Sequence, residues 1–242
     1  MIAIIGGSGL TRLPELNIIH RQIVRTPYGL PSSPLLMGNL GSQNIVFLAR
    51  HGINHTLAPH EINYRANIWA LQSVGVGNIV SISSVSSANR DLALGSLVVP
   101  HDLIDYTFNR EATFSGGQSQ PVMHIDFSPP YDRELRLRLL QHAASHNTPV
   151  SRRAVYGCLQ GPRMPTVAEV RRYCNDGVDI IGMTGMPEAV LARELNMAYV
   201  HLCAVTGTAA TNDNGSPEQS PEFRSLQAEK AIQKIRQLLV DL

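Results

Sequence analysis

Residues 50–71 read RHGINHTLAPHEINYRANIWAL and join a polar loop to an apolar helical repeat. The loop half is rich in histidine, arginine and asparagine. The second half has apolar residues at helical spacing, namely Ile62, Ala66, Trp69 and Ala70. This spacing predicts a helix with a buried face from Ile62 onward, and the apolar run at 45–49 predicts a buried strand before the loop.

A cation-rich loop between a buried strand and a helix favours an oxyanion site. The reason is that helix N-termini and arginine side chains both attract negative charge. A solvated loop with histidine and asparagine caps is the alternative interpretation of the same stretch.

The N-terminus predicts a second place for an anion. An apolar run at 1–5 stops at the glycine-rich segment 6–9, which predicts a buried strand opening into a glycine turn. Such turns bring backbone N–H groups close to phosphate, and Ser8 adds a hydroxyl donor. A dinucleotide fingerprint would need a third glycine where Arg12 stands, and an acidic residue about twenty residues on. The turn therefore favours phosphate contact, or a plain turn, over a nucleotide cofactor.

Strand-like and helix-like segments alternate along the rest of the chain. Predicted strands lie at 18–24, 34–37, 78–82, 97–100, 154–159, 179–184 and 199–205, and predicted helices at 133–145, 167–173, 187–195 and 222–242. The serines at 83–87 suit either a donor cradle for an anion or a hydroxyl-rich turn, and the turn is favoured. The alternation predicts an α/β fold with a largely parallel or mixed sheet in a single domain over residues 1–242.

Composition narrows the class of function. Of the 242 residues 43% are hydrophobic and 16% charged, with 20 Lys+Arg against 19 Asp+Glu. This balance gives no electrostatic basis for binding nucleic acid or an anionic membrane. No segment approaches the roughly 18 apolar residues of a membrane span, and no secretory signal is recognisable. Three cysteines without a CxxC predict reduced, buried thiols. We therefore expect a cytoplasmic protein that acts on small molecules.

Six blocks of the chain together resemble the trimeric purine nucleoside and methylthioadenosine phosphorylases. These blocks are IIGGSGL (4–10), the tract at 50–71, LVVPHDLIDYT (97–107), MHIDFS (123–128), QGPR (160–163) and GMTGMPEAVLARE (182–194). The likeness runs from residue 4 to about residue 206. Within the family, these blocks look most like those of the bacterial S-methyl-5'-thioinosine phosphorylases.

The resemblance implies a fold and a reaction. The fold would be α/β, a mixed twisted β-sheet closing toward a barrel and flanked by helices. The chain would form a homotrimer with its sites near subunit interfaces. The reaction would be phosphorolysis of S-methyl-5'-thioinosine to hypoxanthine and 5-methylthioribose 1-phosphate. No metal or organic cofactor is implied, and inorganic phosphate is a co-substrate.

The resemblance also implies roles for individual residues. Phosphate would be held by Ser8, Arg50, His51, the backbone near Ser84, and Thr184. Met183 would lie against the ribose, Met164 would take the place where relatives often stack an aromatic ring on the base, and His124 would reach the 5' pocket of a neighbouring subunit. Core packing of Met183 and an ordinary structural role for His124 are the alternatives.

Four positions depart from the family pattern. Gly207 stands where relatives carry an Asp or Asn that hydrogen-bonds the purine, and Ala209 stands at a second acidic position. The glycine pair of the phosphate loop is replaced by serines 86–87. Asp213, with its neighbours Asn212 and Asn214, could fold back to replace the missing side chain, although an ordinary turn is favoured there.

These departures leave several functions open. Loss of both acidic groups argues against a 6-aminopurine, so a methylthioinosine phosphorylase leads. A methylthioadenosine phosphorylase, a general 6-oxopurine nucleoside phosphorylase and a catalytically weak nucleoside-binding homologue are the alternatives. A hydrolase would need a paired acid and base, for which Asp102, Asp105 and Glu188 are the available carboxylates. The helix after residue 222 is expected to wall the 5' pocket with Phe223 and Leu226.

Overall fold

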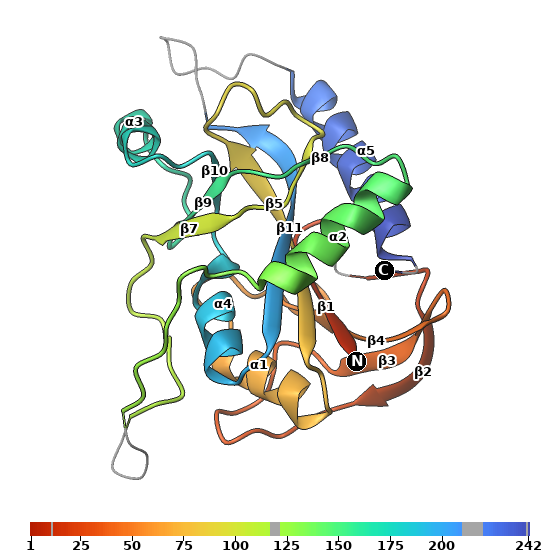
Figure 1. Cartoon of the computed structure of the whole chain (residues 1–242). Helices are drawn as coiled ribbons and strands as arrows, with labels where there is room; N and C mark the ends of the chain where they lie inside the picture. The colour runs from red at the N-terminus through yellow and green to blue at the C-terminus, as the bar shows by residue number, and fades with distance from the viewer. Residues whose placement is uncertain (11, 117–121, 210–219, 241) are drawn as a thin grey trace.

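The computed structural model describes residues 1–10, 12–116, 122–209, 220–240 and 242. In these residues eleven strands form one mixed sheet (Figure 1). The strands are β1 (Ile2–Gly6), β2 (Asn17–Gln22), β3 (Leu35–Leu40), β4 (Gln43–Ala49), β5 (Asn78–Ser87), β6 (Leu97–Val98), β7 (Asp102–Asp105), β8 (Val150–Ser151), β9 (Val155–Cys158), β10 (Ile180–Gly182) and β11 (Ala198–Thr208). Their main order is β2-β3-β4-β1-β5-β10-β9-β7, and β11, β6 and β8 form a branch from β5.

The sheet divides at β5, and this division positions the candidate site. One edge of β5 pairs with parallel β11 over nearly its full length. The other edge pairs with parallel β1 over residues 78–81 and then with antiparallel β10 over residues 86–87. Residues 82–85 lie between these two ladders. On this edge of β5, the polar groups of residues 82–85 are not used by a neighbouring strand, so they can form hydrogen bonds with side chains or a ligand.

Helices cover both faces of this sheet. They are α1 (Tyr64–Ser73), α2 (Arg133–Ser145), α3 (Val167–Asn175), α4 (Gly185–Glu194) and α5 (Pro221–Leu239). In Figure 1 α1 and α4 lie together at the lower end, while α2 and α5 lie along the right side. His142 of α2 lies 3.0 Å from the carbonyl of Leu238 in α5, which ties those two helices together.

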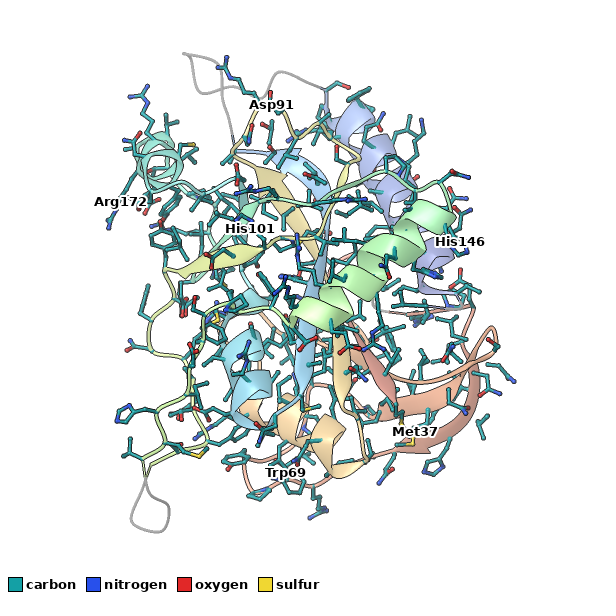
Figure 2. The ribbon with its side chains drawn as sticks, viewed as in Figure 1. Met37, Trp69, Asp91, His101, His146 and Arg172 are labelled. Atoms are coloured by element: carbon teal, nitrogen blue, oxygen red, sulfur yellow. The ribbon has the colours of Figure 1, made fainter. Side chains whose placement is uncertain are left out.

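The central strand β11 contributes side chains to two separate hydrophobic cores, because successive side chains of a strand point to opposite faces of the sheet. Tyr199, Cys203 and Val205 belong to the core that includes α1 and α4. Val200 and Leu202 belong to the core that includes α2 and α5. Figure 2 shows the extent of the molecule along the direction of β11. Trp69 of α1 lies at one end, and Asp91, which follows β5, lies at the other.

The predicted fold class is confirmed: the chain is α/β with a large mixed sheet flanked by helices. The predicted helix at 133–145 has those bounds in the structure. The helix predicted from Ile62 begins instead at Tyr64, because the side chain of Asn63 accepts a hydrogen bond from the backbone N–H of Ala66 and caps it.

Two expectations were wrong in detail. The serines at 83–87 are not a turn, because they continue β5 and pair with β11 as far as Ser87. Of the three thiols, Cys158 and Cys203 are buried, but Cys174 is exposed. The short strands β7 and β8 had no clear periodicity in sequence and were not predicted. No helix in the described ranges is long and apolar enough to cross a membrane.

Candidate active site

A cavity of about 150 Å³ lies beside residues 82–85, where the sheet divides. Seven of the residues predicted for the site line it: Ser8, Arg50, His51, Ser84, Met164, Met183 and Thr184. They come from five separate parts of the chain. The cavity shares Ser8, Ser84 and Thr206 with a second, open cavity of about 800 Å³ that runs along α5.

Arg50 forms a fully buried ion pair with Glu188. Its Nε donates to Oε1 of Glu188 at 2.7 Å and its Nη2 donates to Oε2 at 3.0 Å. Nη2 also donates to Ser81 Oγ, and Nη1 donates to the carbonyl of Ile82 at 3.1 Å, in the gap between the β1 and β10 ladders. Four of the five guanidinium N–H groups are thus bonded within the protein. One N–H of Nη1 remains to contact an anion.

The carboxylate of Glu188 is ionised in this pair. Burial alone would raise its pKa, but the charge of Arg50 and hydrogen bonds from Arg50, Ser81 and Tyr199 hold the pKa below its ordinary value. The two charges cancel. The cavity beside this pair therefore offers an anion directed hydrogen bonds rather than a net positive charge.

Gly7, in the N-terminal turn, lies so close to Arg50 that no side chain fits at this position. A Cβ on Gly7 would come within 2.7 Å of both Nη1 of Arg50 and the carbonyl oxygen of Ile82. Any larger residue would displace the guanidinium. The backbone N–H of Arg50 donates to the carbonyl of Gly6 at 3.0 Å, which joins the turn after β1 to the loop after β4.

His51 is held as the neutral tautomer that carries its proton on Nδ1. Nδ1 lies 2.8 Å from the carbonyl oxygen of Leu57, which can only accept a hydrogen bond. Burial, then the charges of Arg50 and His55, lower the pKa of His51 to about 4. Nε2 is left as an acceptor. It therefore suits a hydroxyl group, such as that of hydrogen phosphate or of a sugar, better than a bare oxyanion.

The loop that carries Thr184 is fixed by Tyr156. The hydroxyl of Tyr156 accepts from the backbone N–H groups of Thr184 and Gly185, each at 3.2 Å. A Cβ on Gly182 or Gly185 would come within 2.8 Å of the Tyr156 ring. The two glycines that flank Met183 and Thr184 are therefore required by the approach of this ring, and Thr184 lines the cavity.

Ser8 and Ser84 connect the first turn to β5. Ser84 Oγ donates to the carbonyl of Ser8 at 3.0 Å, so its single proton holds the turn in place. Ser8 Oγ lies 3.5 Å from Nε2 of His55 and remains available as a donor. Of these two hydroxyls, Ser8 is the one positioned to donate to an anion.

Arg110 organises the side of the cavity formed by Met183. Nη1 donates to the carbonyls of Met183 and Met186 at 2.9 and 2.6 Å, and Nη2 donates to those of Leu159 and Gln160 at 3.3 and 2.7 Å. One side chain thereby links two loops that line the site. Met164 lies on the outer side of the cavity with 61% of its surface exposed.

Three predicted residues are not among those that line the cavity. His124 is exposed, on the segment between β7 and α2, and Asp213 lies outside the described residues. Gly207 lies next to the cavity, because a Cβ on it would come 2.9 Å from the hydroxyl of Ser86, which lines the cavity. Phe223 and Leu226 do not wall the α5 cavity; they are 44% and 48% exposed, on another face of the helix.

The residues that line the smaller cavity include no carboxylate. Glu188 is bonded to Arg50, Asp105 accepts from the backbone N–H of Thr107, and Asp102 from that of Leu103. An acid and base on either side of a sugar, as hydrolysis requires, are not present among these groups. In the described ranges no three His, Cys, Asp or Glu side chains gather at a metal-binding distance.

Comparison with known proteins agrees with this arrangement. A sequence model described as the phosphorylase superfamily matches residues 1–242. The chain belongs to the phosphorylase superfamily. A relative from Pseudomonas syringae, named "Probable S-methyl-5'-thioinosine phosphorylase", is 49% identical over 86% of this chain and 85% of its own. A 6-oxopurine nucleoside phosphorylase from Pyrococcus furiosus is 44% identical over 86% of this chain and 80% of its own.

The fold is also that of a solved phosphorylase. The structure of a methylthioadenosine phosphorylase from Schistosoma mansoni, in complex with adenine, superposes with a TM-score of 0.92 at 30% identity. It covers 99% of this chain and 89% of that chain. Membership of the superfamily makes this protein a phosphorylase-type enzyme, and its cavity is a candidate active site on independent geometric grounds.

Reasoning from sequence missed the buried groups that support the site of this superfamily member. Glu188 was considered only as one of the carboxylates available to a hydrolase, although a carboxylate inside an apolar helix indicates a buried cationic partner. Arg110 and His201 were not singled out, and Ser83 was considered only as part of the serine cluster at 83–87. Each lies in a segment whose local pattern is that of an ordinary strand or loop, so only the tertiary structure identifies them.

We expect the free energy of unfolding to fall as the pH drops from about 6.5 toward 4. Burial, and after it the charge of Arg50, lowers the pKa of His51 to about 4 and that of His201 to about 3. Near pH 5 the unfolded chain therefore binds two protons that the folded chain does not. Urea titrations at stepped pH measure this slope. A stability that stays constant across the window would contradict the burial of both rings.

Proposed function

We propose that this protein cleaves S-methyl-5'-thioinosine with inorganic phosphate, giving hypoxanthine and 5-methylthioribose 1-phosphate. The observation that carries the proposal is the single cavity lined by Ser8, Arg50, His51 and Thr184, which offers directed hydrogen bonds to a small oxyanion. The relative from Pseudomonas syringae supports the choice of nucleoside.

The proposed mechanism uses the protein mainly to position charge. The C1'–N9 bond breaks and its electron pair passes to the purine, which takes up the proton that hydrogen phosphate loses in the overall reaction. A phosphate oxygen then bonds to C1'. Positive charge develops on the sugar, and the adjacent phosphate stabilises it electrostatically. Holding both reactants in one site lowers the entropic part of the barrier, by about 7–11 kcal/mol in well-aligned cases.

The base preference rests on what position 207 lacks. Neither Gly207 nor Ala209 has a side chain that accepts a hydrogen bond, so neither can receive one from a 6-amino group. This supports a 6-oxopurine over adenine. A second candidate, a general 6-oxopurine nucleoside phosphorylase, is supported by the polar side chains of Ser225, Glu229 and Gln233 in the α5 cavity, which suit a 5'-hydroxyl.

A substrate panel separates these functions. Purified protein is assayed with methylthioinosine, inosine, methylthioadenosine and adenosine, each with and without phosphate. We expect phosphate-dependent release of hypoxanthine, with the higher kcat/KM for methylthioinosine. A higher value for inosine would favour the second candidate, and adenine release would overturn the base assignment. Absence of turnover with every substrate would leave only a nucleoside-binding homologue.

Restoring a side chain at position 207 is expected to speed the release of the base. The Gly207→Asn variant places an amide beside Ser86, whose hydroxyl can rotate away, and the backbone at 207 is not left-handed. A hydrogen bond to the departing purine should raise kcat by about tenfold or more. The Gly207→Ala variant is the matched control, because it adds the same Cβ without the amide. Equal rates for both variants would show that leaving-group help comes from elsewhere.

We also propose that the chain forms a homotrimer. The described parts of the segment between β7 and α2, residues 106–116 and 122–132, run past α4 and away from the sheet (Figure 1). They carry the exposed apolar side chains Phe108, Val122 and Met123, next to His124. Contact with a second subunit would bury these groups and bring His124 to its partner's site. Light scattering should give three times the chain mass of 26.4 kDa, and a monomer would contradict the proposal.

A further inference from the structure

A chain of three polar side chains runs from the protein core to the wall of the candidate active site. His201, in the middle of β11, is fully buried, and its Nε2 lies 2.8 Å from Ser83 Oγ. Ser83 Oγ lies 3.1 Å from Thr184 Oγ1. Ser83 belongs to the part of β5 between the β1 and β10 ladders, and Thr184 lines the cavity. The direction of the protons along this chain decides what Thr184 can offer to a ligand.

The surroundings of the imidazole decide where its proton lies. The rings of Tyr131, Tyr156 and Tyr199 surround it, with centroid distances of 4.7–6.4 Å. Nδ1 has no hydrogen-bond partner among the described residues. A Cβ on Gly185 would come 3.2 Å from Cε1 and 3.3 Å from Nδ1 of the ring, so Gly185 packs closely against this edge of the imidazole. A buried N–H without an acceptor costs more than a lone pair without a donor, so a proton on Nδ1 is disfavoured.

The proton is therefore on Nε2. Burial, and after it the charge of Arg50, keeps the pKa of His201 near 3, so the ring is neutral at ordinary pH and holds one proton only. Nε2–H donates to Ser83 Oγ. The hydroxyl of Ser83 then donates to Thr184 Oγ1, and the hydroxyl hydrogen of Thr184 is left to point into the cavity.

If the hydrogen bonds between His201, Ser83 and Thr184 ran in the opposite direction, the site would disfavour an anion. If Thr184 donated to Ser83, its oxygen would face the cavity with lone pairs only and would repel an oxyanion. The backbone N–H groups of Thr184 and Gly185 cannot compensate, because both donate to Tyr156. At Thr184 the hydroxyl is thus the group that can donate to the site.

We propose that His201 is a positioning residue that, acting through Ser83, sets the Thr184 hydroxyl as a hydrogen-bond donor to inorganic phosphate. This inference rests on the proposed function, because it assumes that the cavity binds phosphate. It assigns a role in the reaction to a residue that touches neither phosphate nor nucleoside.

The test compares inorganic phosphate binding, by calorimetry, in the wild type and three variants. His201→Phe keeps an aromatic ring but removes the donor, and should weaken phosphate binding by about tenfold, as for loss of one hydrogen bond to a charged group. His201→Gln places an N–H near the position of Nε2 and should restore most of the affinity. Tyr131→Phe is the matched control, because it alters a ring packed on His201 outside the relay, and should leave the affinity unchanged within about twofold.

Steady-state kinetics and NMR complete the test. In His201→Phe the KM for phosphate should rise while the KM for nucleoside stays constant, which a general loss of packing would not produce. In the wild type, nitrogen NMR of the His201 ring should show the proton on Nε2, and this measurement needs no variant to fold. A proton on Nδ1, or equal phosphate affinity in wild type and a folded His201→Phe variant, would overturn the relay alone. A wild type that binds no phosphate would overturn the proposed function as well.

Discussion

Replacing Glu188 by glutamine is expected to destabilise the protein by about 3–5 kcal/mol, the range found when one partner of a buried ion pair is removed. The carboxylate accepts from Arg50, Ser81 and Tyr199 at the centre of the fold. An amide has nearly the same shape but is neutral, and its NH2 group would face donors. The charge of Arg50 would then be buried without a counter-ion.

A matched control is available on the surface. Glu169 is bonded to Arg163 at 2.6 and 2.8 Å, much as Glu188 is to Arg50, but that pair is exposed to solvent. The Glu169→Gln variant should therefore lose far less stability. Urea unfolding of both variants measures the difference. Similar losses for the two would contradict the central structural role of the buried pair.

Loss of Arg110 is expected to reduce kcat/KM by about a hundredfold, since a displacement of about 1 Å at a site can have an effect of that size. In Arg110→Met the four carbonyls that the guanidinium joins would lose their donor. The loops that carry Met164 and Met183 would no longer be held together. Arg110→Lys should recover little of the activity, because one ammonium group cannot reach both loops.

Arg193 provides the control for this prediction. It also donates to backbone carbonyls, those of Asp126 and Pro129, in the same long segment between β7 and α2. It does not line the cavity and contacts neither loop of the site. Arg193→Met should therefore retain kcat/KM within about twofold. If Arg193→Met and Arg110→Met lost activity equally, the effect would belong to the segment as a whole and not to the loops that Arg110 joins.

The sequence predicted the parts of the site that lie in local motifs. The glycine turn at 6–9 and the cation-rich loop after the strand ending at Ala49 each have a pattern that indicates an anion site, and the segment GMTG was identified from the family resemblance. The structure brings these three segments to one cavity. The family resemblance supplied the individual residues, and seven of them line that cavity.

What could not be predicted depends on contacts between distant strands. The serines at 83–87 had the composition of a turn, but pairing with β11 makes them a strand, because tertiary pairing overrides local preference. Glu188 and Arg50 are 138 residues apart in sequence, so no local pattern links them. The side of α5 that faces the larger cavity is likewise set by the packing of this helix against β11. This packing places Ser225 in the wall of that cavity, and not Phe223 or Leu226.

The most direct measurement is the product balance of methylthioinosine cleavage by the purified protein at known phosphate concentration. We predict that one phosphate is consumed for each hypoxanthine released and that all of the sugar appears as 5-methylthioribose 1-phosphate. Free 5-methylthioribose with no phosphate consumed would mean that water, and not phosphate, is the nucleophile. That result would contradict the assignment of the cavity at Arg50, His51 and Thr184 as a phosphate site.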